Sequence, residues 1–186
     1  MRHSIINICS IKFGLYEQTT PAGTIPYLQV RQFNDQGKLI TMNEEFVTLN
    51  EKTEPYLLKD GDVLFVGKGS RLFSWCYREE IGPAIASSIF FILRPDQKLV
   101  YPEYLATILN ASQSRAVFQQ IGGGTNIFSI RKSELGAFEI SLPSMNKQKR
   151  IAALTALHQQ EIYTMEQLTK QKQDLYTAIL SKLLKD

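Results

Sequence analysis

Cysteine and histidine are scarce in this chain, with two of each among 186 residues. Cys9 and Cys76 stand far apart, as do His3 and His158, so the sequence has no Cys-x-x-Cys pair and no His/Cys group with zinc-ligand spacing. We therefore predict no metal site and no bound cofactor. The two thiols are interpreted as ordinary buried side chains, and a disulfide between them is the alternative.

Long hydrophobic runs are also missing. No stretch reaches the roughly 18 apolar residues that a membrane-spanning helix needs, and residues 1–10 are too polar for a secretory signal. We expect a cytoplasmic protein. The content of 44% hydrophobic and 21% charged residues is typical of a globular fold, and the length of 186 residues suits one domain with an appendage.

The excess of positive charge is small and lies at one end of the chain. The formal net charge is +3. Residues 147–186 contain 7 basic and 4 acidic residues, whereas residues 1–146 contain 14 of each. A nonspecific nucleic-acid binder is expected to have a larger and broader surplus, because its affinity comes from neutralising phosphates. The charge balance therefore neither indicates nor excludes a sequence-specific DNA reader.

Catalytic and nucleotide-binding motifs are absent from the sequence. The Gly-Lys-Gly segment at residues 67–69 begins like a dinucleotide fingerprint, but Leu72 stands where the third glycine belongs. No phosphate-binding loop, Gly-x-Ser-x-Gly elbow or Cys/His nucleophile pair occurs. Asp96 follows a proline, as in some metal-dependent nucleases, yet no Glu-x-Lys comes after it, and a turn is the better interpretation. We predict that the chain binds and does not catalyse.

Short apolar segments between Gly, Pro, Asn and Asp residues predict β-strands. The segment 84–93 is almost continuously apolar, as in a strand buried on both faces, and we expect it at the centre of a sheet. A helix is expected over residues 102–120, where glycines end it. The other expected strands are residues 25–32, 38–42, 62–67 and 137–142. Together these elements predict an α+β (mixed α/β) domain with a twisted β-sheet and a few helices.

The last part of the chain contains neither glycine nor proline and is rich in good helix formers. With Ser144 as the N-cap, one helix is expected from about residue 147 to residue 185, a length of about 58 Å. Such a helix is too long to be hidden in a small domain. We therefore place the globular domain at residues 1–143 and a long C-terminal coiled-coil helix at residues 144–186.

Apolar residues of this helix follow a heptad repeat with flaws. Positions a are Ile151, His158, Met165, Lys172 and Ile179, and positions d are Leu154, Glu161, Leu168, Leu175 and Lys182. Neighbouring e positions widen the apolar stripe through Ile162, Tyr176 and Leu183. The predicted dimer interface consists of Ile151, Leu154, Met165, Leu168, Leu175 and Ile179. Packing of the stripe on the chain's own domain is the alternative.

Two Gly-rich segments are candidate loops for ligand contact. The first, residues 67–71, has two cations beside glycines, which suits phosphate or guanine contacts; a solvated hairpin is the alternative. The second, residues 122–126, precedes two basic residues, and its alternative is a helix end followed by a turn. The nearby alternating aromatic residues Phe73, Trp75 and Tyr77 are interpreted as one face of a strand packed on the core.

Several segments follow one another along nearly the whole chain in a recognisable order. They are GTIPYLQVR (23–31), GDVLFVGKG (61–69), PEYL (102–105), GTNI (124–127), and ISLP (140–143) leading into QKRI (148–151). In order and spacing these segments resemble the DNA specificity subunits of type I restriction-modification systems.

The resemblance implies a target recognition domain that reads one half of a bipartite site in double-stranded DNA. It also implies that paired long helices form a coiled-coil spacer and dock the methyltransferase subunits. Catalysis then belongs to separate methyltransferase and restriction subunits, which bind S-adenosylmethionine, ATP and magnesium. The candidate contacts of this domain with bases or phosphates are Lys68, Ser70, Arg71, Thr125 and Asn126, followed by Arg31, Gln32 and Lys132.

The chain departs from the family pattern because it holds one recognition domain and one helix, whereas a full specificity subunit resembles two such units in tandem. Since the family's spacer is an antiparallel helix pair, we expect two copies of this half subunit to pair through their helices. Such a homodimer has two-fold symmetry and reads a palindromic site with a nonspecific gap. The alternative from another class is an interaction adaptor or specificity-subunit mimic that dimerises without reading DNA, and a small nuclease is the third hypothesis.

Overall fold

The computed structural model describes residues 2–34, 37–42, 44–123 and 127–184. The chain divides into two compact units, Met1–Lys149 and Arg150–Asp186. The expected boundary after residue 143 falls inside the first unit, because the start of the long helix is hydrogen-bonded there through Gln148.

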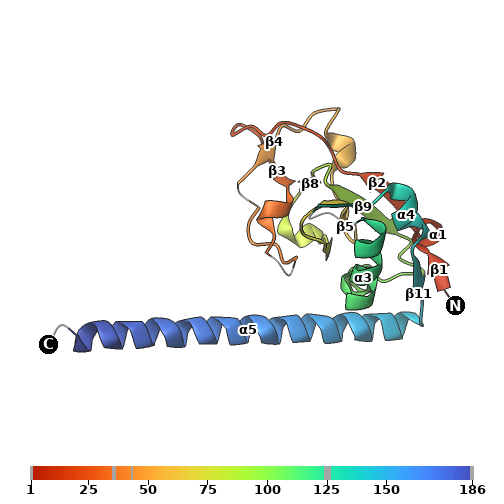
Figure 1. Ribbon diagram of the computed structural model, residues 1–186. Helices are drawn as coiled ribbons and strands as arrows, with labels where there is room; N and C mark the ends of the chain where they lie inside the picture. Colours follow the sequence, from red (N-terminus) through yellow and green to blue (C-terminus); the bar gives the residue numbers. More distant parts are fainter. Residues whose placement is uncertain (1, 35–36, 43, 124–126, 185–186) are drawn as a thin grey trace. The chain divides into compact units, whose positions relative to one another are not determined.

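Four antiparallel strands form the centre of the first unit in the order β2-β9-β5-β7. They are β2 (Cys9–Phe13), β9 (Phe90–Pro95), β5 (Val63–Val66) and β7 (Ser74–Cys76). Figure 1 labels β2, β9 and β5 among them. All but one residue of β9 are buried, and β9 has strand neighbours on both sides. The apolar segment 84–93 is therefore central, as expected, although a turn divides it into β9 and the short strand β8 (Ile85–Ala86).

Three smaller sheets complete the strand pairing among the described residues. In one, β3 (Ile25–Leu28) lies between β4 (Phe46–Val47) and β8. The other two are pairs, β1 (Arg2–Ser4) with β11 (Glu139–Ser141) and β6 (Lys68–Gly69) with β10 (Phe128–Ser129). The strand expected at residues 38–42 is not formed, since Leu39 makes only an isolated bridge.

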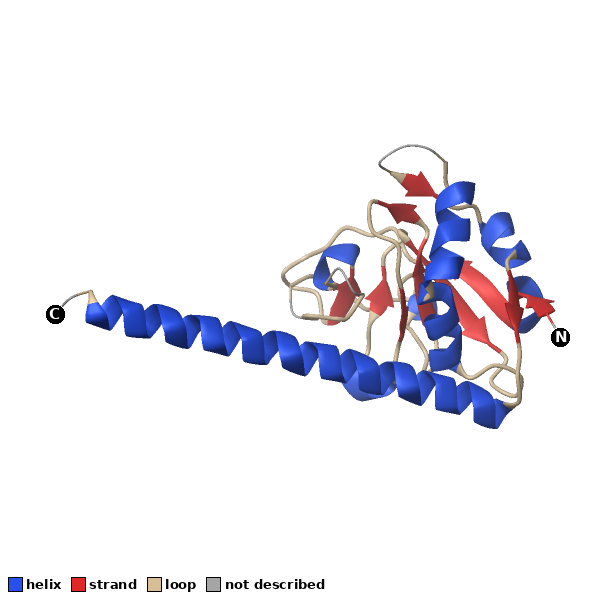
Figure 2. Cartoon of the chain, turned by 60° about the horizontal axis from the view of Figure 1, so that its bottom comes forward, coloured by secondary structure: helices blue, strands red, loops and turns tan. Residues whose placement is uncertain are grey.

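Helices and 3-10 turns cover the sheets (Figure 2). The helices of the first unit are α1 (Ile5–Ile8), α2 (Pro102–Asn110), α3 (Ser112–Ile121) and α4 (Lys132–Ala137). The 3-10 turns are η1 (Val30–Gln32), η2 (Glu54–Tyr56) and η3 (Glu79–Ile81). The strand expected over residues 25–32 ends early because the backbone and side chains of Gln29 and Gln32 form a reciprocal cap that begins η1.

The single helix expected at residues 102–120 is two helices, which meet at Ala111 in an extended conformation. Asn110 gives a physical reason for the break. Its side-chain amide donates to the carbonyl of Ser74 and accepts from the Ser74 N–H, both at 2.8 Å. The Asn110 side chain thus satisfies the N–H and the carbonyl of Ser74, as the backbone of a neighbouring strand would. This fixes the end of α2 to β7, and the chain changes direction at Ala111.

The core of the first unit is rich in aromatic side chains. The ring of Phe33 packs tilted against Phe73 and edge-to-face against Trp75 and Phe90, with ring centroids 5.1, 5.3 and 5.7 Å apart. Such pairs add about 0.5–1.5 kcal/mol each beyond the area that they bury. Phe73 and Tyr77 are buried and Trp75 is half-buried, which confirms that these alternating aromatics pack on the core.

A buried carboxylate ties the central strands to their connecting turn. Asp62 is fully buried and receives two hydrogen bonds of 2.7 Å from the guanidinium of Arg94 on β9. The backbone N–H of Lys59 donates to the same carboxylate at 2.8 Å. The hydrogen bonds to Asp62 raise the pKa of Arg94. Three donors in all offset the cost of burying the Asp62 carboxylate.

The second unit is the continuation of one helix, α5 (Met145–Leu183), which begins two positions earlier than expected. The carbonyl of Ser144 accepts the first helical bond from the N–H of Gln148 at 3.0 Å, as a capping residue does. The last expected helical position, residue 185, lies outside the described residues. No helix in the described part of the chain is long and apolar enough to span a membrane.

Candidate nucleic-acid interface

The structure pairs the first Gly-rich segment with the residues that follow the second one. Strand β6 begins directly after Gly67, and β10 lies close after the second Gly-rich segment. The two strands pair antiparallel, with Lys68 opposite Ser129 and Gly69 opposite Phe128. We call this two-stranded element, residues 67–71 with 127–130, the β6–β10 ribbon.

Backbone hydrogen bonds hold the ribbon to the sheet. The N–H of Gly67 donates to the carbonyl of Ile89 at 2.9 Å, and its carbonyl accepts from Ile130 at 2.8 Å. A side chain at position 67 would collide with the ring of Phe91, since a Cβ there lies 2.4 Å from it. At Gly69 there is space for a side chain, but the backbone φ of +139° is one that other residues rarely adopt. Glycine is therefore favoured there by the backbone conformation and not by crowding.

Exposed polar groups line this ribbon. Lys68 and Ser70 are exposed on its first strand and loop, and Lys132 is exposed where α4 begins, two residues beyond Ile130. Thr125 and Asn126, which were predicted to contact DNA, lie outside the described residues. Lys68 and Ser70 thus lie on the ribbon, and Lys132 follows its second strand in sequence.

Three other predicted contacts have structural partners. Arg71 extends from the ribbon to η1, where its guanidinium donates to the carbonyls of Phe33 and Val30 at 2.7 Å each. Arg31 forms an ion pair with Glu45 while its side chain stays 55% exposed. These contacts place η1 beside the ribbon, and contact of Arg71 or Arg31 with DNA stays a prediction.

Gln32 does not face solvent. Its side chain is completely buried, and its oxygen accepts a hydrogen bond of 2.7 Å from the N–H of Gln29. The sequence predicts position 32 at the end of a strand, but the reciprocal cap of η1 turns this side chain inward. The burial argues against Gln32 as a base contact in this conformation.

Sequence reasoning missed two exposed residues of the ribbon. Ser129 is exposed directly across from Lys68, and Ile127 has 58% of its surface exposed. Ile89, held to Gly67, is 40% exposed beside them. No local pattern marks these positions, because their common location depends on a pairing between distant segments.

The arrangement is suited to recognition of a polar groove. A two-stranded ribbon fits the major groove of DNA, where hydroxyl and ammonium groups can meet base edges or phosphates. The cysteines offer no competing chemistry, since burial raises the pKa of Cys9 to about 12 and, with Glu103 nearby, raises that of Cys76 to about 12. Within the described ranges, no group of three or more His, Cys, Asp or Glu residues could hold a metal ion.

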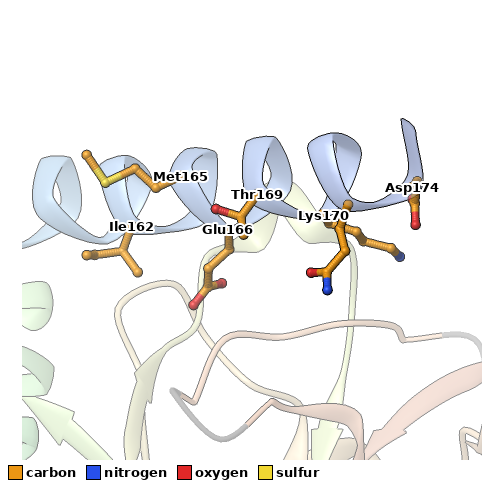
Figure 3. Close-up of a pocket in the computed structure, with 7 residues that line it drawn as sticks. Ile162, Met165, Glu166, Thr169, Lys170 and Asp174 are labelled. Carbon is orange, nitrogen blue, oxygen red and sulfur yellow. The ribbon is translucent and has the colours of Figure 1, made fainter. Parts of the chain in front are cut away.

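The helix of the second unit has its own apolar surface. Leu154, Leu168 and Leu175 are 69%, 51% and 61% exposed, and Met165 is 55% exposed. The hollow drawn in Figure 3 is lined by α5 alone and mixes apolar with charged side chains. Its lining is Ile162, Met165, Glu166, Thr169, Lys170, Gln173 and Asp174. We assign it no ligand, and the apolar positions are available to a partner helix.

Comparison with known proteins decides the family. The type I restriction modification DNA specificity domain matches residues 5–183. The chain belongs to this family. The match covers the globular unit and the long helix, so both parts are those of a specificity domain.

Solved structures agree on the fold of this specificity domain. The S subunit of the type I restriction-modification system from M. genitalium is similar with a TM-score of 0.62 and 17% identity over 88% of this chain. A structure described as the basis of complex assembly and conformational transition of the type I R-M system has a TM-score of 0.62, with 17% identity over 89%. The HsdS subunit from Thermoanaerobacter tengcongensis has a TM-score of 0.55, with 18% identity over 90%.

The specificity domain spans only 40%, 39% and 39% of the length of these three chains, in the same order. No curated protein matches the sequence. A single copy of this chain therefore corresponds in fold to less than half of each solved chain.

Proposed function

We propose that this specificity domain reads one half of a bipartite site in double-stranded DNA for a type I restriction-modification system. The observation that carries the proposal is the family match across residues 5–183, which includes both the globular unit and the helix. In this proposal the chain is not an enzyme, and the chemistry belongs to separate methyltransferase and restriction subunits.

The β6–β10 ribbon is the proposed DNA-contacting element. Lys68 and Ser129 lie opposite each other on its two strands and are exposed. An ammonium group next to a hydroxyl can contact a phosphate and a base edge in the same groove. Ser70, Thr125, Asn126 and Lys132 remain further proposed contacts.

Self-association through α5 supplies the second half-site. The proposed interface consists of Ile151, Leu154, Met165, Leu168, Leu175 and Ile179. A single helix cannot bury such a stripe, so a second helix is its natural partner. A two-fold dimer with one recognition domain per copy reads a palindromic site, and its helices set the gap and dock the methyltransferase subunits.

Selection from random double-stranded oligonucleotides, with the cognate methyltransferase subunit present, tests the reading of DNA. We expect enrichment of two inverted half-sites with a constant gap. Replacement of Lys68 and Ser129 by alanine should weaken the enrichment and relax the preference at one position of each half-site, whereas the matched double variant Lys98→Ala and Ser112→Ala, with both residues exposed outside the ribbon, should leave the motif unchanged. If no motif is enriched although the methyltransferase is bound, the adaptor interpretation replaces this proposal.

Light scattering tests the self-association separately. We expect about twice the chain mass of 21.2 kDa for the unaltered protein. Leu168→Asp should give a folded monomer, because it places a charge in the middle of the stripe. Gln171→Asp on the same helix adds the same charge outside the a and d positions and should remain a dimer. A monomer at all concentrations would exclude the homodimer.

A further inference from the structure

Two charged residues interrupt the middle of the apolar stripe of α5, and a third, Lys182, stands at a d position in its last turn. Glu161 occupies a d position and Lys172 an a position, where apolar residues are expected. The side chain of Glu161 is 61% exposed, and its carboxylate lies 3.7 Å from the ring nitrogen of His158, one turn earlier on the same face. Lys172 is also exposed. In a helix pair, both charges would enter the seam.

The heptad positions determine what these charges meet. In an antiparallel pair, each a position faces a d position of the other helix, whereas in a parallel pair like positions face each other. In an antiparallel pair, a step toward the N-terminus of one helix is a step toward the C-terminus of the other. If Met165 faces Leu168 of a second copy, Leu154, 11 residues before Met165, therefore faces Ile179, 11 residues after Leu168. The same count places Glu161 opposite Lys172 of the second copy.

We propose that α5 pairs with a second copy of itself, antiparallel and in this single register, and that two symmetric Glu161–Lys172 ion pairs select it. The proposal rests on the homodimer of the proposed function and adds the register and the groups that fix it. The occupant of the exposed stripe is thus a second copy of this chain, because its charges complement those of the first.

Neighbouring antiparallel registers leave both charges without a partner. A slip of one heptad in one direction places Glu161 opposite Ile179 and Lys172 opposite Leu168. A slip in the other direction places Glu161 opposite Met165 and Lys172 opposite Leu154. Either slip buries four unpaired charges per dimer, and an unpaired charge in an apolar seam is strongly unfavourable.

A parallel pair is disfavoured for a different reason. Glu161 would face Glu161 of the second copy, and Lys172 would face Lys172. Like charges that face each other within one core layer repel each other. The Glu161–Lys172 ion pairs therefore select the register. They make the helix interface less stable than apolar residues would, but they destabilise the two shifted registers and the parallel pair more.

Charge reversal tests the ion pairs in the full-length chain. Glu161→Lys and Lys172→Glu each replace two attractive pairs by two repulsive ones, and we expect the dimer dissociation constant to rise by about tenfold or more. The double variant with both changes restores opposite charges and should return to within about threefold of the unaltered protein. A mixture of the two single variants should also dimerise.

The same helix offers matched control residues. Glu166 and Lys170 carry the same charges at b and f positions, outside the proposed seam. In Figure 3 their side chains leave α5 in a different direction from Met165. Glu166→Lys and Lys170→Glu should therefore leave the dissociation constant nearly unchanged. Equal effects of seam and control variants would overturn the proposal.

Cysteine cross-linking reads the register directly. A chain with Leu154→Cys and Ile179→Cys should form disulfide-linked dimers, whereas Leu154→Cys alone should not, because the two copies of residue 154 lie about 37 Å apart in this register. Cross-linking of the Leu154→Cys single variant would indicate a parallel pair. Cross-linking of Ile151→Cys with Leu175→Cys would indicate a slip of one heptad.

The outcomes separate this inference from the proposed function. A dimer with another cross-linking pattern, or single charge reversals without rescue in the double variant, overturns the register and leaves the homodimer and DNA reading intact. A monomeric chain overturns both the homodimer and the register. Loss of DNA enrichment with the expected cross-links rejects DNA reading and keeps the register.

Discussion

The side-chain oxygen of Gln148 accepts a hydrogen bond of 2.8 Å from the backbone N–H of Tyr101. The amide nitrogen of the same side chain donates to the carbonyls of Leu99 and Pro143, both at 2.9 Å. Gln148 is 1% exposed and lies in the first turns of α5. One side chain thus satisfies three backbone groups and fixes the start of the helix to the turn before α2.

Replacement of Gln148 by alanine should therefore destabilise the globular unit. The change removes three partly buried hydrogen bonds to the backbone, and we expect a loss of about 2–4 kcal/mol in the free energy of unfolding. Urea denaturation measures it. Gln159→Ala, at an exposed position of the same helix, should change stability by less than about 0.5 kcal/mol. Hydrogen exchange at the Tyr101 amide should accelerate only in the Gln148 variant.

The sequence predicts the elements whose signals are local. The apolar run of residues 84–93 predicts a central strand, which is found as β9 after the turn that separates it from β8. The absence of glycine and proline predicts α5, which begins two positions before the expected start. The break between α2 and α3 has no such signal, because it depends on the pairing of Asn110 with Ser74, 36 residues away. Predictions of this kind fail where a distant segment supplies the deciding hydrogen bonds.

The candidate site shows the same division. Glycine and cation patterns mark Lys68 and Ser70 as loop residues, and both are exposed. Ser129 is found only through the β6–β10 pairing, and the inward turn of Gln32 only through its cap with Gln29. Residue type alone does not distinguish a glutamine that contacts DNA from one, such as Gln32, whose side chain caps a 3-10 turn.

The Asp62–Arg94 pair should be important for stability. Asp62→Asn removes the charge that holds the guanidinium and disturbs the bond from Lys59. The side chain of Arg94 is 36% exposed, so water screens part of the interaction and we expect a loss of about 2 kcal/mol, less than for a fully enclosed pair. The free energy of unfolding from urea denaturation checks it. Lys52→Met, in the exposed pair with Glu17, should have little effect.

Binding of the selected DNA should depend on Lys68 in a salt-sensitive way. Lys68→Ala should lower affinity by about three- to tenfold and reduce the slope of log affinity against log salt by about 1, because one phosphate contact is lost. Ser129→Ala should instead relax the preference at one base position, with a cost of about 1–3 kcal/mol for the preferred base. Fluorescence anisotropy at several salt concentrations separates the two effects. Lys98→Ala, on the turn before α2, should change neither.

Stability should fall above about pH 9, in part through Cys9. Burial raises the pKa of this thiol from 9.0 to about 12, so the unfolded chain releases the proton first and the folded chain holds it. The contribution of the protonated thiol to the free energy of unfolding is therefore complete below pH 9 and is lost as the pH rises toward 12. The free energy of unfolding then falls by about 1.4 kcal/mol per pH unit for one proton.

Urea denaturation between pH 8 and pH 10.5 measures how steeply the free energy of unfolding falls with pH in the unaltered protein and in Cys9→Ala. The variant should be less stable at pH 8 because of its cavity, but its stability should decline less steeply, since the tyrosines that also titrate are common to both proteins. Equal slopes in the two proteins would mean that the Cys9 thiol ionises as readily in the folded chain as in the unfolded one.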